Sequence, residues 1–242
     1  MNLRIKYFLF FLFSFSSFVL FAQDQVGDDD DDGFPAKKTS PENGKKNYYL
    51  FSSKVNITVP HAISNSSFKK CFVGIYEVSG GLNVFIYKGL FIGGNYENGL
   101  LKITQNKIPN YDVSMHLDNA AGKIGGDLYL GERNRVVLST AISFGQNWTR
   151  YYGLVAKDPH KTVTNTSYNC TFYEPEVDLY FLADDNFGVG ATIKYTVFDH
   201  TFDPYELSLN DWAAFNQTSA GSTQYLSFGF AVYYNFLKKK HQ

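Results

Sequence analysis

The clearest indication of the fold is the run from Tyr225 to Phe236, which reads YLSFGFAVYYNF. Every second residue of it belongs to an oily row: Leu226, Phe228, Phe230, Val232, Tyr234 and Phe236. The residues between them, such as Ser227, Gly229 and Asn235, are small or polar. A period of two with two unlike faces predicts a β-strand whose two sides meet different surroundings.

Other runs of the sequence show the same alternation. They lie near residues 49–59, 72–86, 90–97, 123–130, 136–148, 173–181 and 187–197. Their charged residues lie on the row opposite to the oily one: Lys54, Glu77, Glu97, Lys123, Asp127, Glu174, Glu176, Asp178 and Lys194. Together with the final run, the pattern predicts about eight strands.

The connections between the predicted strands alternate between short and long. Short turns are predicted at residues 87–89, 131–134 and 183–186, and longer polar connections near residues 60–68, 105–121, 153–169 and 201–221. This alternation is typical of an all-β, antiparallel up-and-down transmembrane β-barrel of the outer membrane. The alternative is a soluble, lipocalin-like barrel, whose oily row would face inward. Lipid contact explains better why aromatic and branched apolar residues fill one row of nearly every strand.

The first residues predict an export signal. Arg4 and Lys6 precede an uncharged apolar run that ends at Ala22. This is the layout of a cleaved signal peptide, whereas a membrane-spanning helix needs roughly 20 apolar residues. Removal of the two cations changes the formal charge from −1 to −3. A chain with a slight acidic excess has no general attraction for nucleic acid, so no nucleic-acid partner is expected.

The rest of the chain divides by composition. Five consecutive aspartates begin at Asp28, and glycine and proline follow, so this segment predicts a flexible linker. The acidic run lacks the turn glycine and the spacing of a calcium-binding loop. The expected order is a signal peptide at 1–22, the acidic linker at 23–47, the outer-membrane barrel at 48–237 and a basic C-terminal tail at 238–242.

The closing run carries a family resemblance. Residues 229–236, GFAVYYNF, resemble the last strand of outer-membrane proteins, and residues 237–242 follow the terminal aromatic here. In those proteins the barrel-assembly machinery reads that aromatic, so the resemblance implies this machinery as a partner. The whole of residues 48–237 resembles the small outer-membrane β-barrel proteins of Bacteroidota. The resemblance also implies contact with outer-membrane lipid, and it implies no activity.

The charged inner row predicts how the barrel is filled. An eight-stranded barrel is only wide enough for its own side chains, so charges on its inner face are expected to pair across the lumen. The alternatives are an ion or proton path, and an acidic catalytic pair.

A second resemblance concerns His116, Asp118 and Asn119, which resemble the His-x-Ser-Asn segment of the outer-membrane lipid A deacylases. Asp118 stands at the position of the serine nucleophile, and a carboxylate cannot perform the serine's acyl transfer. His116 is therefore expected in a solvated loop. The other histidines are predicted in loops or in the tail, without ligand spacing: His61, His160, His200 and His241. The sequence predicts no catalytic, cofactor-binding or metal-binding residue and no cofactor.

Two further features concern cysteines and aromatic residues. Cys71 and Cys170 fit no metal-binding spacing, and the sequence does not decide whether they form a disulfide. Trp148, Tyr151 and Tyr152 are predicted in an aromatic belt at the membrane interface.

These observations predict a non-enzymatic outer-membrane barrel. Its outward loops are expected to serve adhesion, binding of an envelope or extracellular protein, or a structural role in an envelope complex. One alternative is a narrow pore or a transporter of hydrophobic ligands, and another is a lipid-modifying enzyme. The fold by itself does not choose among them.

Overall fold

The structure, a computed structural model, describes residues 48–103, 111–130, 135–157, 160–184, 186–207, 209 and 221–239. The predicted signal peptide at 1–22, the linker at 23–47 and residues 240–242 of the predicted tail lie outside these ranges. The last strand continues to Lys239, two residues beyond the boundary predicted for the barrel.

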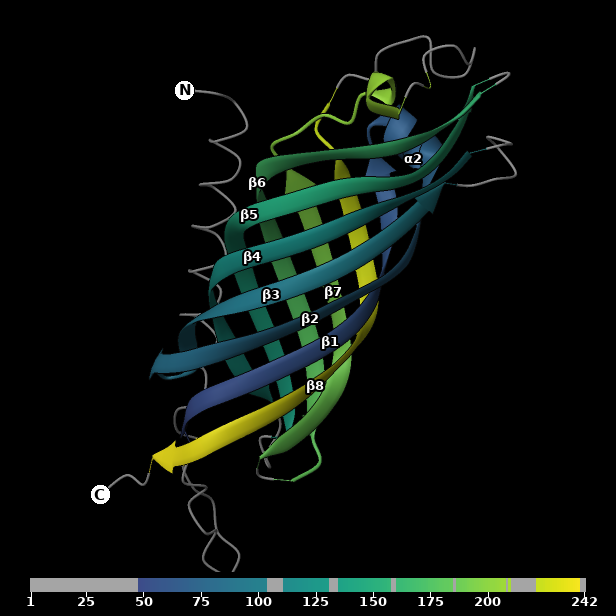
Figure 1. Ribbon diagram of the computed structural model, residues 1–242. Helices are drawn as coiled ribbons and strands as arrows, with labels where there is room; N and C mark the ends of the chain where they lie inside the picture. Colours follow the sequence, from purple (N-terminus) through teal and green to yellow (C-terminus); the bar gives the residue numbers. More distant parts are fainter. Residues whose placement is uncertain are drawn as a thin grey trace, which may run out of the picture. The chain divides into compact units, whose positions relative to one another are not determined.

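The strands close into one antiparallel barrel in which each strand pairs with its neighbours in sequence and the last strand pairs with the first (Figure 1). The strands are β1 (Tyr48–Ser64), β2 (Phe72–Tyr87), β3 (Leu90–Ile103), β4 (Tyr111–Leu130), β5 (Val136–Lys157), β6 (His160–Leu182), β7 (Phe187–Phe198) and β8 (Gln224–Lys239). The predicted fold class and the count of eight strands are confirmed. Among the described residues, no helix is long and apolar enough to cross a membrane.

The tight turns lie at one end of the barrel, as predicted. Between β2 and β3 the φ angles are 36° at Lys88 and 88° at Gly89, which matches the positive φ values of a two-residue hairpin turn. Glycine is required at the second position because a Cβ there would lie 2.5 Å from the carbonyl oxygen of Asp127. Residues 131–134, another predicted turn, lie outside the described residues.

The strands at the other end are longer than predicted. β4 begins at Tyr111, β5 continues to Lys157 and β6 begins at His160, so much of residues 105–121 and 153–169 is strand instead of loop. Figure 1 shows the ends of β5 and β6 reaching beyond the other strands. The prediction was wrong for two reasons. In β4 the oily row, Val113, Met115 and Leu117, faces inward here, the reverse of its facing elsewhere in the barrel. In β6 residues 160–169 are mostly polar on both rows, so no contrast marks the strand.

Two short helices also lie at this end. α2 (Ser66–Cys71) follows β1 directly, and the side chain of Asn65 caps it by accepting a hydrogen bond from the amide of Phe68 at 3.1 Å. The 3₁₀ helix η1 (Pro204–Leu207) lies in the connection between β7 and β8. Both stand in segments that were predicted as loops.

The facing of one residue at the start of β2 was also predicted wrongly. Phe72 was placed on the oily row with Tyr76, but it is buried inside. The cause is a register shift between Gly74 and Tyr76 in the pairing with β3. An extra residue in one strand reverses the facing of everything beyond it.

Candidate functional site

The middle of the lumen holds a network of ion pairs. Nζ of Lys54 lies 2.8 Å from Oδ1 of Asp178 and 2.9 Å from Oε2 of Glu176. Nζ of Lys123 lies 3.0 Å from Oε1 of the same glutamate. Glu176 on β6 therefore bridges two ammonium groups that come from β1 and β4. A charge buried in this way needs a partner, since desolvation is costly for an unpaired ion.

A second group of charges lies one level closer to the long-strand end. Lys194 of β7 forms ion pairs with Glu77 of β2 and Glu97 of β3. The hydroxyl of Thr58 donates to Glu77 at 2.8 Å, and the side-chain amide of Asn119 donates to Glu97 at 2.7 Å. This group joins side chains from β1, β2, β3, β4 and β7, so it ties opposite walls of the barrel together.

The two remaining inner carboxylates accept hydrogen bonds from hydroxyl groups. Thr196 donates to Oε2 of Glu174 at 2.5 Å, and Tyr180 donates to Oδ2 of Asp127 at 2.9 Å. All charged residues predicted for the inner row therefore lie inside and have a partner. The prediction that charges pair across the lumen is confirmed for the three lysines and for Glu77, Glu97, Glu176 and Asp178, whereas Glu174 and Asp127 bond neutral hydroxyl groups.

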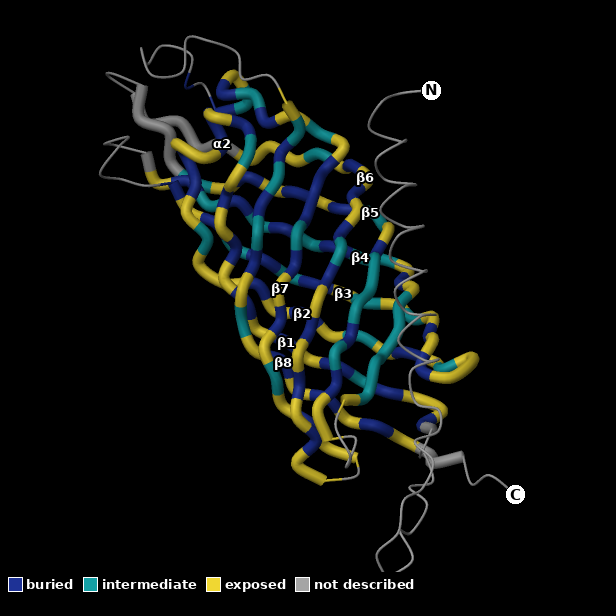
Figure 2. Tube along the Cα trace, turned by 180° about the vertical axis from the view of Figure 1, so that it is seen from behind, coloured by how far each residue is buried: buried dark blue, intermediate teal, exposed yellow. Residues whose placement is uncertain are grey.

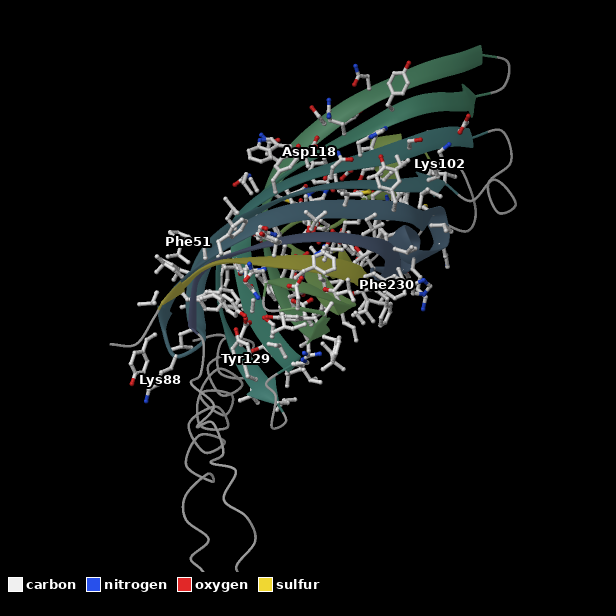
Figure 3. All side chains as sticks on the ribbon, turned by 90° about the horizontal axis from the view of Figure 1, so that it is seen from below. Phe51, Lys88, Lys102, Asp118, Tyr129 and Phe230 are labelled. Carbon is white, nitrogen blue, oxygen red and sulfur yellow. The ribbon has the colours of Figure 1, made fainter. Side chains whose placement is uncertain are left out.

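The lumen is closed at the level of these charges. The exposed fraction of every lysine and glutamate in the two groups is 7% or less, so a water-sized sphere hardly reaches them. Figure 3 shows side chains crowding the space that the strands enclose. Among the described residues, no three His, Cys, Asp or Glu side chains are arranged to hold a metal ion.

An apolar cluster, here called the outer plug, fills the barrel above the charges at the long-strand end. It is built around Phe68 of α2, Phe72 of β2, Tyr151 of β5 and Phe202 from the segment after β7. The ring of Phe202 lies 5.5 Å from that of Phe72 and 6.2 Å from that of Tyr151, measured between centroids. Tyr151 was predicted in the interfacial belt, which was wrong, because its side chain points inward while Trp148 and Tyr152 point outward.

The tight-turn end has a smaller apolar cluster. The rings of Tyr180 and Tyr233 stack with centroids 3.9 Å apart, and Val137, Leu182 and Ala231 pack with them. The lumen therefore consists of two apolar layers with a layer of paired charges between them.

Both cysteines belong to the outer plug. Cys71 ends α2 and Cys170 lies on β6, and both are buried with free thiols. The disulfide that the sequence left open is absent from the structure. Packing explains their burial, because a free cysteine behaves as a small apolar side chain.

The outside of the barrel is apolar along the strands. Phe230 is 79% exposed, and Ile193 and Leu82 are exposed on neighbouring parts of the wall. Figure 2 shows exposed and buried residues alternating along much of the wall, and Phe51 and Phe230 lie on the outer side of the wall in Figure 3. An oily exterior around a charged interior is the reverse of a soluble barrel and suits contact with lipid. The chain is an outer-membrane β-barrel.

The segment that resembles the lipid A deacylases lies on this outer wall. Oδ1 of Asp118 accepts from the hydroxyl of Tyr96 at 2.8 Å and from Asn98 at 3.0 Å, and Nη2 of Arg150 lies 2.9 Å from Oδ2. His116 sits on β4 opposite Arg150 of β5, so its predicted position in a loop was wrong. The carboxylate of Asp118 is engaged in a hydrogen-bond cluster on the outer wall.

The other histidines occupy separate places. His61 lies on β1 and His160 begins β6, so their predicted positions in loops were wrong. His200, in the connection after β7, stacks on Tyr168 with ring centroids 3.8 Å apart and contacts Glu206 at 3.0 Å. His241 lies outside the described residues.

The feature that the sequence did not predict is a side of β6 that pairs with no strand in the described part of the chain. β6 pairs with β5 from His160 to Phe181, but its pairing with β7 begins only at Phe172. We call residues 160–170 the outer edge of β6. The only signal for it in the sequence is a run of β-favouring threonines beside asparagines, which reads equally well as a polar loop.

Comparisons with known proteins find structural similarity only. No protein-family model matches the sequence, and no curated protein matches it. Neisserial surface protein A shares 10% identity at a TM-score of 0.47, with 77% of this chain and 97% of that chain covered. The attachment invasion locus protein Ail of Yersinia pestis shares 10% identity at 0.46, with 77% and 97% covered. The outer-membrane protein AlkL shares 10% identity at 0.39, with 88% and 99% covered.

Proposed function

We propose that this protein is a closed, non-enzymatic scaffold of the outer membrane that binds a partner protein through the sheet it extends outward. The observation that supports this function is the filling of the lumen by paired charges and by the outer plug. A barrel without a path through it can act only at its surfaces, and binding residues are usually carried by outward segments on a rigid scaffold.

The competing proposal, a narrow pore or a conduit for hydrophobic ligands, fits the geometry less well. Ions would have to displace the Lys194 ion pairs, and an apolar ligand would have to pass a layer of charges. Leaving a buried charge without its partner is strongly unfavourable. An enzymatic role has no support from the described residues, because the inner carboxylates are engaged in pairs and Asp118 is bonded on the outer wall.

Conductance of the purified protein in planar lipid bilayers tests the closed lumen. We expect no channel activity above the bare bilayer, with a general porin in the same lipid as the positive control for insertion. Insertion of this protein is checked separately by its resistance to protease in vesicles. Stable and reproducible channels would contradict the proposal and favour transport.

A further inference from the structure

Among the described residues, no strand pairs with one side of the outer edge of β6. β5 covers the opposite side along its whole length, in a register that runs without a shift from His160 to Phe181. On the free side, pairing with β7 ends at Phe172 and Phe198, and beyond it the amide of Asp199 donates to the carbonyl of Thr171 at 2.8 Å. No other strand in the described ranges pairs with residues 160–170.

That last hydrogen bond shows which residues face the free side. In an antiparallel strand the N–H and C=O of one residue point to the same side, and the side alternates along the chain. Because the carbonyl of Thr171 points toward β7, the backbone groups of Asn169, Ser167 and Asn165 point the same way. These three residues present a row of donors and acceptors spaced as in a β-ladder.

The central part of the outer edge, residues 164–169, lacks the features with which proteins usually protect a free strand, and the one lysine of the edge, Lys161, stands nearer its tip. Lysine, proline, a bulge or an inward charge normally discourages pairing at an edge. Residues 164–169 read TNTSYN, without charge or proline, and no bulge interrupts them. The side chains of Asn165, Thr166, Ser167 and Asn169 are exposed. An uncharged, regular and exposed edge is suited to receive another strand.

A second copy of this chain in the same membrane does not fit the edge. Strands of outer-membrane barrels tilt by roughly 35–45° from the membrane normal. A two-fold axis along the normal would cross the two β6 strands at roughly twice that angle, which prevents strand pairing. The occupant must be free to align with β6, as an extended segment of a different polypeptide is.

We infer that the outer edge of β6, centred on Asn165, Ser167 and Asn169, binds an extended segment of a partner polypeptide by antiparallel β-strand addition. Backbone hydrogen bonds supply the affinity in this mode, and side chains at alternate positions supply specificity. The uncharged side chains of residues 164–169 match a partner strand rich in threonine, serine or valine. This inference rests on the proposed function and names the kind of partner.

Amide hydrogen exchange of the full chain in lipid nanodiscs tests the inference. The probe is a capped eight-residue peptide of alternating threonine and valine with a lysine at each end. In the free protein the amides of Thr166 and Tyr168, which face β5, should exchange slowly, whereas those of Asn165, Ser167 and Asn169 should exchange fast. Excess peptide should slow the exchange of the amides of Asn165, Ser167 and Asn169. The same peptide with alternate amides N-methylated should not slow it. An edge already protected in the free protein, or one that stays unprotected with the peptide, would overturn the inference.

A pair of proline variants adds a second test. Ser167→Pro removes a donor on the free side only, so the barrel should fold and peptide binding should weaken about tenfold or more, the equivalent of one hydrogen bond. Thr166→Pro removes a donor from the ladder with β5 and should destabilise the hairpin instead. Ser167→Lys, which keeps the backbone intact, should also weaken binding if Ser167→Pro fails to fold. Unchanged peptide binding in these folded variants would contradict the inference.

Failure of this inference and failure of the proposed function are distinguishable. A conducting protein would refute the closed scaffold whatever the peptide does. A closed protein whose edge binds no peptide would refute strand addition and leave the scaffold proposal standing.

Discussion

Lys194 shows how single residues hold this barrel together. It lies in the lumen with an exposed fraction of 1%, and its ammonium group meets carboxylates from two other strands. On the outer wall, Arg150 pairs with Asp118, but 61% of the arginine side chain is exposed. The two ion pairs have similar chemistry and different surroundings, so their contributions to stability should differ.

Substitution of each cation by methionine measures that difference. Lys194→Met leaves Glu77 and Glu97 buried without a counter-charge, and we expect a loss of about 3–5 kcal/mol of unfolding free energy. Arg150→Met, the matched control, should cost about 0–1 kcal/mol because solvent screens the pair. The measurement is the urea midpoint of both variants in lipid vesicles. Equal losses would mean that the lumen is hydrated instead of packed.

At the scale of elements, the turn between β6 and β7 is held by one carboxylate. Oδ1 of Asp184 accepts hydrogen bonds from the amides of Asn186 and Phe187, both at 2.7 Å. These bonds hold the pKa of Asp184 below its ordinary value, since they favour the charged form. A carboxyl group with a lowered pKa stabilises the folded state above its unfolded pKa, and the contribution is lost as the pH falls through the folded value.

The contribution of this turn to stability should therefore depend on pH. We expect Asp184→Ala to be less stable than the unchanged protein at neutral pH, and the difference should shrink below about pH 4, where the carboxyl group becomes protonated. Asp184→Asn keeps an acceptor oxygen without the titration, so its stability relative to Asp184→Ala should not change with pH. Urea midpoints at several pH values give the comparison. A difference that grows in acid would show that the sign is wrong.

At the scale of the whole molecule, the lumen is sealed twice. The charged layer ties the walls together, and the outer plug closes the end where the strands extend outward. Phe202 comes from a segment far along the chain from Phe68 and Phe72, yet its ring packs against both. The plug therefore anchors the connection between β7 and β8 to the start of the barrel.

Removal of this anchor should loosen the outer end without opening a channel. Phe202→Ala takes a buried ring out of the plug and should cost about 3–5 kcal/mol, while protease should cut the segment around residues 199–207 faster. Tyr205→Ala, in the same segment but 61% exposed, is the control and should have little effect. Conductance of Phe202→Ala in planar bilayers should stay negligible because the charged layer remains. Channels formed by Phe202→Ala would show that the outer plug alone closes the lumen.

The wall of the barrel and the contents of its lumen could be predicted from sequence. Each strand inside the membrane separates lipid from a charged interior. Successive residues such as Thr192, Ile193 and Lys194 therefore alternate between polar and apolar, and this alternation can be read from the local sequence. The same reasoning placed the tight turn at Lys88 and Gly89. These features depend on residues close together in the chain, so local patterns of residues are enough to predict them.

Which residues meet in the lumen, and where the strands end, became known only from the folded barrel. The pairing of Lys194 with Glu77 and Glu97 depends on the stagger of the strands around the barrel, which no local pattern contains. Outside the lipid both sides of a strand are polar or packed under the plug, so the outward parts of β5 and β6 lose the contrast that marks a strand. The edge of β6 is exposed because β7 stops opposite Phe172, whereas β6 extends outward as far as His160. The relative lengths of neighbouring strands are set by the closed sheet.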